Sequence, residues 1–140
     1  MTIQTAIEYE KSKDTYMVNH NATLSILRLI RGLDFIRQLI DGLNHSANDN
    51  KKIHEIAVHA YETTLSFRHK WAIRQLVKAG FYLLPKKSDL IEIMLHGAEH
   101  KSTKKEIEAV FQEFLTSINK VYSIIHKIYD ENDFLELVLA

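Results

Sequence analysis

The sequence predicts an all-α protein folded as a single domain over residues 1–140. Apolar residues make up 46% of the chain, and only one proline and four glycines interrupt it. Apolar side chains recur at the three- and four-residue spacing of helices, and no segment alternates with the two-residue period of a strand. A chain of this length fits one domain. We therefore expect several long helices packed around a core.

The two helices predicted in the first part of the chain differ in how clearly their apolar pattern indicates them. Residues 2–16 form a weak helix. The next helix is capped by Asn19 or Asn21 and runs to about Leu43, and residues 44–50 form a loop after it. This second helix is apolar around most of its surface, so it is packed on most sides. Its apolar arc consists of Ile26, Leu29, Ile30, Leu33, Ile36, Leu39, Ile40 and Leu43.

Three further helices are predicted in the second half. The first begins near residue 50, continues or bends near His69, and ends before Pro85. The second is short and covers residues 88–96, because Gly97 stops it. The last begins at about residue 103 and is the longest. Its apolar stripe consists of Ile107, Val110, Phe111, Phe114, Ile118, Val121, Tyr122, Ile125, Ile128 and Tyr129.

The last helix carries a sequence signal for its own first turn. Ser102 or Thr103 opens this helix, and Glu106 is placed for a capping box if Thr103 is the cap. Elsewhere in the chain, Lys86 and Lys87 are expected to be ordinary solvated charges, and the alternative for them is a contribution to a membrane-facing patch.

Composition argues against several classes of function. Lys plus Arg and Asp plus Glu number 18 each, and the resulting formal net charge of +0 argues against a nucleic-acid binder. The chain has no cysteine, which rules out disulfides and thiolate metal sites. His96 and His100 have metal-like spacing around Glu99, but Gly97 interrupts the helix that would align them. We expect no metal, no cofactor and no catalytic residue.

The expected location follows from the absence of targeting signals. Residues 1–20 are charged and lack an apolar run. No stretch approaches the ~18 consecutive apolar residues of a membrane span. A cytoplasmic protein is therefore expected.

The stretch from Ala60 to Asp89 is the most informative part of the chain. His69 lies on an otherwise apolar helical line with Leu65, Ile73 and Leu76, and we expect this face to look inward. Such a histidine is usually a hydrogen-bonded core residue. Trp71 points the other way, into a basic surface that includes Lys70 and Arg74. Because indoles favour the membrane interface, the pairing indicates a protein that holds a mostly apolar ligand and touches a membrane.

Arg28 is the second unusual residue. It sits at the edge of the apolar arc of the helix that ends near Leu43. A guanidinium there must reach solvent, pair with a carboxylate, or meet a ligand anion. Gly32, one turn later, leaves space beside it. Arg31 is a further candidate for the anion, although we favour a structural or solvated role for it.

Three segments resemble the glycolipid transfer protein family. ATLSILRLIRGLDFIRQLIDGL (residues 22–43) is similar to the family's central helix. AYETTLSFRHKWAIRQLVKAGFYLLPKKSD (residues 60–89) resembles the next helix pair, including the histidine, the tryptophan two residues later and the Pro-x-Lys-Ser-Asp turn. FLTSINKVYSIIHKIY (residues 114–129) matches the C-terminal helix in pattern. The resemblance implies a two-layer all-α sandwich that encloses the chains of a sphingolipid.

The resemblance also implies roles for individual residues. His69 matches the histidine that hydrogen-bonds the ceramide amide group, and Trp71 matches the tryptophan that docks on membranes. Arg28 stands where sugar-binding members have a tryptophan, and it resembles the ceramide-1-phosphate branch, since a phosphate favours a bidentate cation. That branch has a second arginine where this chain has Leu24, so phosphate and sugar both stay open. The implied lipid-chain pocket consists of Leu24, Phe35, Leu65, Ile73, Leu76, Phe114 and Ile118.

No segment of this chain resembles the family's first two helices. Residues 1–21 resemble instead the helix that connects those two to the central helix. We expect the uncovered apolar face to be handled in one of three ways: a homodimer, a partner that supplies helices, or a truncated form with impaired lipid binding. The implied function is non-enzymatic binding and intermembrane transfer of a sphingolipid by a cytoplasmic protein peripheral at membranes. The alternative is a helical protein-interaction module that has lost lipid transfer.

Overall fold

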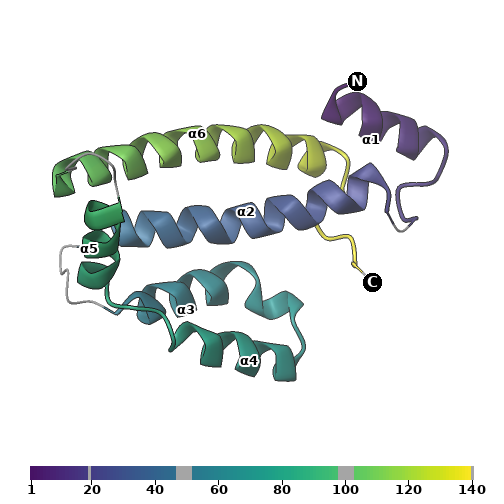
Figure 1. Ribbon diagram of the computed structural model, residues 1–140. Coiled ribbons are helices and arrows are strands. Elements are labelled where there is room, and N and C mark those ends of the chain that lie inside the picture. The colour runs from purple at the N-terminus through teal and green to yellow at the C-terminus, as the bar shows by residue number, and fades with distance from the viewer. Residues whose placement is uncertain (19, 47–51, 98–102, 140) are drawn as a thin grey trace. The chain divides into compact units, whose positions relative to one another are not determined.

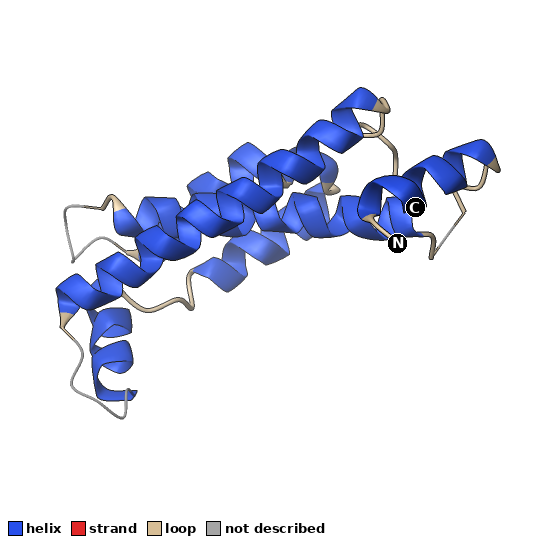
Figure 2. Cartoon of the chain, turned by 90° about the horizontal axis from the view of Figure 1, so that it is seen from above, coloured by secondary structure: helices blue, strands red, loops and turns tan. Residues whose placement is uncertain are grey.

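The structure is a computed structural model that describes residues 1–18, 20–46, 52–97 and 103–139. Within these ranges the regular elements are helices, and the one pairing of β type is an isolated bridge between Lys52 and Lys86 (Figures 1 and 2). The predicted all-α class is confirmed. The elements are α1 (Ile3–Ser12), α2 (Ala22–Asn44), α3 (Ile53–Thr64), the 3-10 turn η1 (Ser66–Arg68), α4 (Trp71–Phe81), α5 (Lys87–Gly97) and α6 (Lys104–Glu131).

The chain divides into two compact units. The first consists of Met1–Asp34 with Asn119–Ala140, and the second is Phe35–Ile118. The long helices α2 and α6 each contribute residues to both units. The single domain over residues 1–140 stays a prediction.

No helix in the described part of the chain is both long enough and apolar enough to cross a membrane.

The first unit has its own apolar core. Ile7 of α1, Leu27 of α2 and Tyr129 of α6 are all completely buried in it. The Tyr129 hydroxyl donates to the backbone carbonyl of Thr23 over 2.5 Å, which satisfies the phenol inside the core. Burial first, and the nearby Glu10 charge second, raise the Tyr129 pKa well above its ordinary value. The tyrosine therefore stays a neutral donor at any physiological pH.

The start of α2 is held by a carboxylate from α1. Glu10 accepts hydrogen bonds from the backbone N–H groups of Ala22 and Thr23 at 2.8 and 2.9 Å, and from the Thr23 hydroxyl at 2.6 Å. These N–H groups have no partner within the helix, and the positive end of the helix dipole attracts the charge. Burial alone would raise the Glu10 pKa, but the bonds from Thr23 and Ala22 outweigh it and lower the pKa.

This capping carboxylate predicts a pH dependence of stability. A depressed pKa contributes stability that is present above the ordinary value of 4.5 and is lost as the pH falls through the folded-state pKa. Glu10→Gln should lower the free energy of unfolding by about 1 kcal/mol at neutral pH. The difference from the parent protein should shrink as the pH falls through the ordinary value of 4.5 and below it. Urea unfolding at several pH values measures this, and a difference independent of pH would contradict it.

In the second unit, α2 and the start of α3 meet at a small buried apolar cluster. Leu43 packs with Ile53 and Ile56, and all three are buried. A methyl group added at Gly42 would lie 2.5 Å from the Ile56 Cγ2 atom. Glycine at this position therefore lets the two helices approach closely.

The predicted capping box of the last helix is present. The Glu106 carboxylate accepts from the Thr103 backbone N–H at 2.7 Å, and the Thr103 hydroxyl accepts from the Glu106 N–H at 3.3 Å.

The expectation that Lys87 is a solvated charge is wrong. Its side chain is buried, and its ammonium donates to the Ser46 carbonyl over 2.7 Å. Lys86 next to it is exposed.

The predicted helix over residues 50–84 is divided between Thr64 and Trp71. The Thr64 hydroxyl donates to the Ala60 carbonyl over 2.7 Å, an acceptor that the helix backbone also uses, while the Thr63 hydroxyl has the Gln38 side-chain oxygen as its nearest acceptor. Such side-chain bonds compete with the helix, and two adjacent β-branched residues weaken it further. The chain tightens into η1, and His69 then adopts extended backbone angles, φ −101° and ψ 142°. Of the two alternatives that the sequence allows here, the bend is the correct one.

Candidate functional site

His69 lies outside any helix, at the turn between η1 and α4. It is therefore not part of a continuous apolar helical line, and this expectation is corrected. Its side chain is half-buried, and its Nδ1 atom lies 2.6 Å from the hydroxyl of Tyr61. The two rings are tilted by 37° with centroids 5.6 Å apart. The histidine is thus oriented by a residue of α3.

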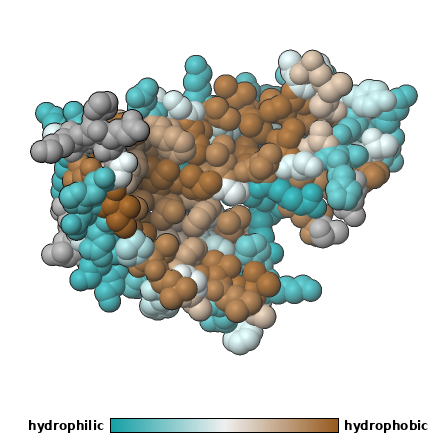
Figure 3. All heavy atoms as spheres, viewed as in Figure 1, coloured by the Kyte–Doolittle hydropathy of each residue, from teal (hydrophilic) through white to brown (hydrophobic). Residues whose placement is uncertain are grey.

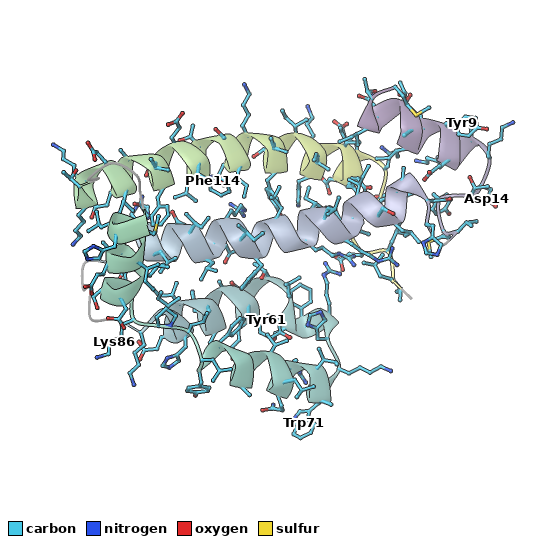
Figure 4. The ribbon with its side chains drawn as sticks, in the orientation of Figure 1. Tyr9, Asp14, Tyr61, Trp71, Lys86 and Phe114 are labelled. Atoms are coloured by element: carbon cyan, nitrogen blue, oxygen red, sulfur yellow. The ribbon has the colours of Figure 1, made fainter. Side chains whose placement is uncertain are left out.

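An aromatic cluster surrounds this pair within the second unit. Phe81 of α4 meets the Tyr61 ring edge-on at 5.8 Å, and Phe35 of α2 stacks on Phe81 at 6.0 Å. Tyr61 is 1% exposed, and Figure 4 shows it on α3 facing the interior of this unit. Sequence reasoning missed the roles of Tyr61 and Phe81. The spacing of eight residues between Tyr61 and His69 gave no signal, because the turn at η1 creates the contact.

Arg28 lies on α2 in the first unit and is exposed. Among the described residues it has no hydrogen-bond or ion-pair partner. A methyl group added at Gly32, one turn later, would meet nothing within 4 Å. The expected open space around Gly32 is therefore present.

The guanidinium of Arg31, unlike that of Arg28, has hydrogen-bond partners within the described part of the protein. Its Nη2 atom donates to the backbone carbonyls of Leu135 and Leu137 at 2.8 and 2.9 Å. Both acceptors belong to the segment after α6, within the same unit. This guanidinium ties the C-terminal segment to α2, which is a structural role.

The register of α4 differs from the prediction. Ile73 and Leu76, which we expected to face inward, are 45% and 70% exposed. Arg74, expected on the outer surface, is half-buried along with Val77 and Phe81. The break before Trp71 explains the change, because α4 is a separate helix whose rotation is not set by α3.

Several large apolar side chains of α4 and of the segments directly before and after it are exposed, and we call this set the α4 surface. It includes Trp71, which is 69% exposed and projects away from α3 in Figure 4. In the space-filling view, hydrophobic residues gather over this part of the second unit (Figure 3). Lys70 beside Trp71 is exposed as well. The large apolar members of the surface are Phe67, Trp71, Ile73, Leu76 and Leu83.

The other residues of the expected lipid-chain pocket are distributed over both units. Leu24 is buried in the first unit, while Ile118 is buried in the second. Leu65 and Phe35 are half-buried, and Phe114, seen on α6 in Figure 4, is 44% exposed.

A metal site finds no support in the described part of the chain, where no group of three or more His, Cys, Asp or Glu side chains is placed to hold an ion. His96 is exposed and lies 3.7 Å from Glu92. Glu99 and His100, the other members of the metal-like spacing, lie outside the described residues.

Comparison with known proteins identifies the class. A sequence model of the glycolipid transfer protein (GLTP) family matches residues 1–96, and the chain belongs to this family. A curated relative, the ceramide-1-phosphate transfer protein of Xenopus tropicalis, is 31% identical over 142 residues, which cover 97% of this chain. The chain spans 63% of the length of that relative.

Solved structures agree with the family assignment. The ligand-free crystal structure of mouse ceramide-1-phosphate transfer protein superimposes with a TM-score of 0.81 at 28% identity, over 96% of this chain and 64% of the other. The human protein in complex with 12:0 ceramide-1-phosphate gives a TM-score of 0.83 at 22% identity, over 97% and 65%. The chain therefore has the fold of the glycolipid transfer proteins, as the resemblance implied.

Proposed function

We propose that this chain binds a sphingolipid and transfers it between membranes without any chemical step, and that its ligand is ceramide-1-phosphate. The observation that carries the proposal is the match to ceramide-1-phosphate transfer proteins over nearly the whole chain. Removal of the lipid chains from water supplies most of the affinity, at ~0.8 kcal/mol per buried CH₂ group.

Arg28 is the proposed phosphate-binding residue. It supplies a permanent positive charge with several donors in a fixed plane, which suits two phosphate oxygens at once. Its exposure and its lack of a partner among the described residues support this role. A buried or paired guanidinium, such as that of Arg31, would have to give up its existing bonds first.

His69 is the proposed contact for the amide group of the ceramide. Its Nδ1 atom is engaged by Tyr61, so the opposite nitrogen, Nε2, is the one left to meet a ligand. Its half-buried position reduces competition from water, which strengthens a hydrogen bond to a neutral amide.

The α4 surface is the proposed membrane-docking site. Exposed indole and aliphatic groups gain free energy at the lipid interface, where the indole N–H still meets polar groups. Lys70 beside Trp71 adds attraction to anionic headgroups. Arg74 contributes less than the sequence suggests, because it is half-buried.

Trp71→Ala is expected to weaken binding to vesicles by about tenfold, since an interfacial indole contributes roughly 1–2 kcal/mol. Vesicle sedimentation measures the bound fraction. Tyr9→Ala is the matched control, because Tyr9 is an aromatic residue of α1 with a similar exposure of 62%. Unchanged vesicle binding by Trp71→Ala, or an equal loss in Tyr9→Ala, would contradict the docking role.

The experiment that tests the function is a transfer assay between two vesicle populations. Donor vesicles carry a fluorescent ceramide-1-phosphate together with a quencher that cannot leave. Protein-dependent recovery of fluorescence in the presence of acceptor vesicles is expected, with a slower rate for fluorescent galactosylceramide. A rate equal to the spontaneous rate for both lipids would contradict the proposal.

A further inference from the structure

The hydrogen bond between Tyr61 and His69 assigns a role to a residue that does not itself meet the ligand. We infer that Tyr61 is a positioning residue that holds His69 as the tautomer protonated on Nε2 and aims this N–H at an acceptor oxygen of the lipid. The inference rests on the proposed function of His69. It deepens that function by naming the residue that sets the orientation and the protonation site of the histidine.

The direction of the bond follows from the chemistry of the two groups. A neutral imidazole has one nitrogen that donates and one that accepts. A phenol is a better donor than acceptor, and Tyr61 Oη lies 2.6 Å from Nδ1. If the hydroxyl donates, Nδ1 is the acceptor and the proton sits on Nε2.

The state of the phenol supports this direction. Burial raises the Tyr61 pKa, although the charges of Arg74 and Lys78 act against the increase. The hydroxyl therefore keeps its proton, and with it the capacity to donate, throughout the neutral range.

The packing around Tyr61 makes it a rigid support. The ring is 1% exposed and meets Phe81 edge-on, at an interplanar angle of 74°. His69, in contrast, follows a short turn, and its own backbone N–H is anchored to the Ser66 carbonyl at 3.2 Å. A fixed phenol on α3 thus sets both the rotation and the protonation site of an imidazole that no helix constrains.

The tautomer selects the class of ligand group. An Nε2–H donor pairs with an oxygen acceptor, such as the carbonyl of an amide. The opposite tautomer, protonated on Nδ1, would have an unprotonated Nε2 that accepts a hydrogen bond, and it would pair with the amide N–H instead. The inferred arrangement therefore predicts recognition of the ceramide carbonyl.

The test uses the full chain with ¹⁵N-labelled histidine, and NMR of the imidazole nitrogens without ligand reports the tautomer directly. In the parent protein with a neutral imidazole, we expect His69 protonated on Nε2 only. In Tyr61→Phe, which keeps the ring packing, we expect a mixture of both tautomers. Binding of ceramide-1-phosphate should then weaken about fivefold, the effect of one ordinary hydrogen bond.

Tyr82→Phe is the matched control. Tyr82 lies beside another histidine, His54, with ring centroids 4.7 Å apart, and this substitution should leave the His69 nitrogens unchanged. A parent protein with its proton on Nδ1 would overturn the inference, and so would a Tyr61→Phe variant with the same pure tautomer as the parent. Failure of the parent protein to bind any sphingolipid would instead contradict the proposed function, which the ligand-free spectra do not test.

Discussion

Arg28→Leu is expected to weaken the affinity for ceramide-1-phosphate by about 10- to 100-fold, because hydrogen bonds to a charged group contribute roughly 1.5–3 kcal/mol. Since Arg28 is exposed on α2, its loss should leave the free energy of unfolding almost unchanged. Equilibrium binding of a fluorescent ceramide-1-phosphate, measured by competition with the natural lipid, gives the ratio of dissociation constants.

Two further variants separate charge from geometry. Arg28→Lys keeps the charge but loses the planar fork, so an intermediate loss of affinity is expected. Lys120→Leu removes another exposed cation of the first unit and should bind like the parent protein. If Arg28→Leu bound ceramide-1-phosphate as tightly as the parent, the phosphate assignment would be wrong. Equal loss for Lys120→Leu would indicate a general charge effect instead.

The second large effect is expected at the contact between α2 and α3. Gly42→Ala places a methyl group 2.5 Å from Ile56 Cγ2. Ile56 is buried and β-branched, so it cannot move aside without disturbing the core. We expect a loss of about 1–3 kcal/mol in the free energy of unfolding, which exceeds the gain of up to about 1 kcal/mol in helix propensity. Urea unfolding followed by circular dichroism measures the change.

Gly32→Ala is the matched control in the same helix. Nothing lies within 4 Å of the added methyl group, so only the gain in helix propensity remains. This variant should be more stable than the parent by roughly 0.5–1 kcal/mol. Combining Gly42→Ala with Ile56→Ala should cost less than the sum of the two single changes, because the clash disappears. Equal effects of alanine at both glycines would contradict the close approach.

Sequence periodicity predicted the helices well where a single local rule applies. The start of α6 is an example, since the Thr103–Glu106 box depends on four consecutive residues. The long apolar α2 is another, because its pattern continues over 23 residues without interruption. In these cases short-range chemistry determines the element, and tertiary packing does not override it.

The predicted helical faces are wrong after the turn η1, where the chain leaves α3 and starts a new helix, α4. The bend near His69 is one of the two predicted alternatives, but the apolar helical line through His69 is wrong, because α3 ends at Thr64 and no proline or glycine marks the break. As a result, the exposed side of α4 was expected to face inward. Lys87 was misjudged for a related reason, since its burial depends on the distant Ser46 carbonyl.

The candidate site was only partly accessible from sequence. Arg28, His69 and Trp71 were identified from their residue types and from the family resemblance. Tyr61 was not, because its contact with His69 spans a 3-10 turn and follows no helical spacing. The roles of Arg28 and Arg31 differ only because carbonyls of the C-terminal segment reach one of them.

The central claim is that this chain takes up a phosphorylated sphingolipid, and native mass spectrometry tests it most directly. The purified chain is mixed with vesicles that contain ceramide-1-phosphate and galactosylceramide, separated from them, and weighed intact. The account predicts one protein chain with one bound lipid whose mass is that of ceramide-1-phosphate. Protein that stays empty after both lipids are offered, above all as an empty dimer, would contradict lipid transfer and favour an interaction module.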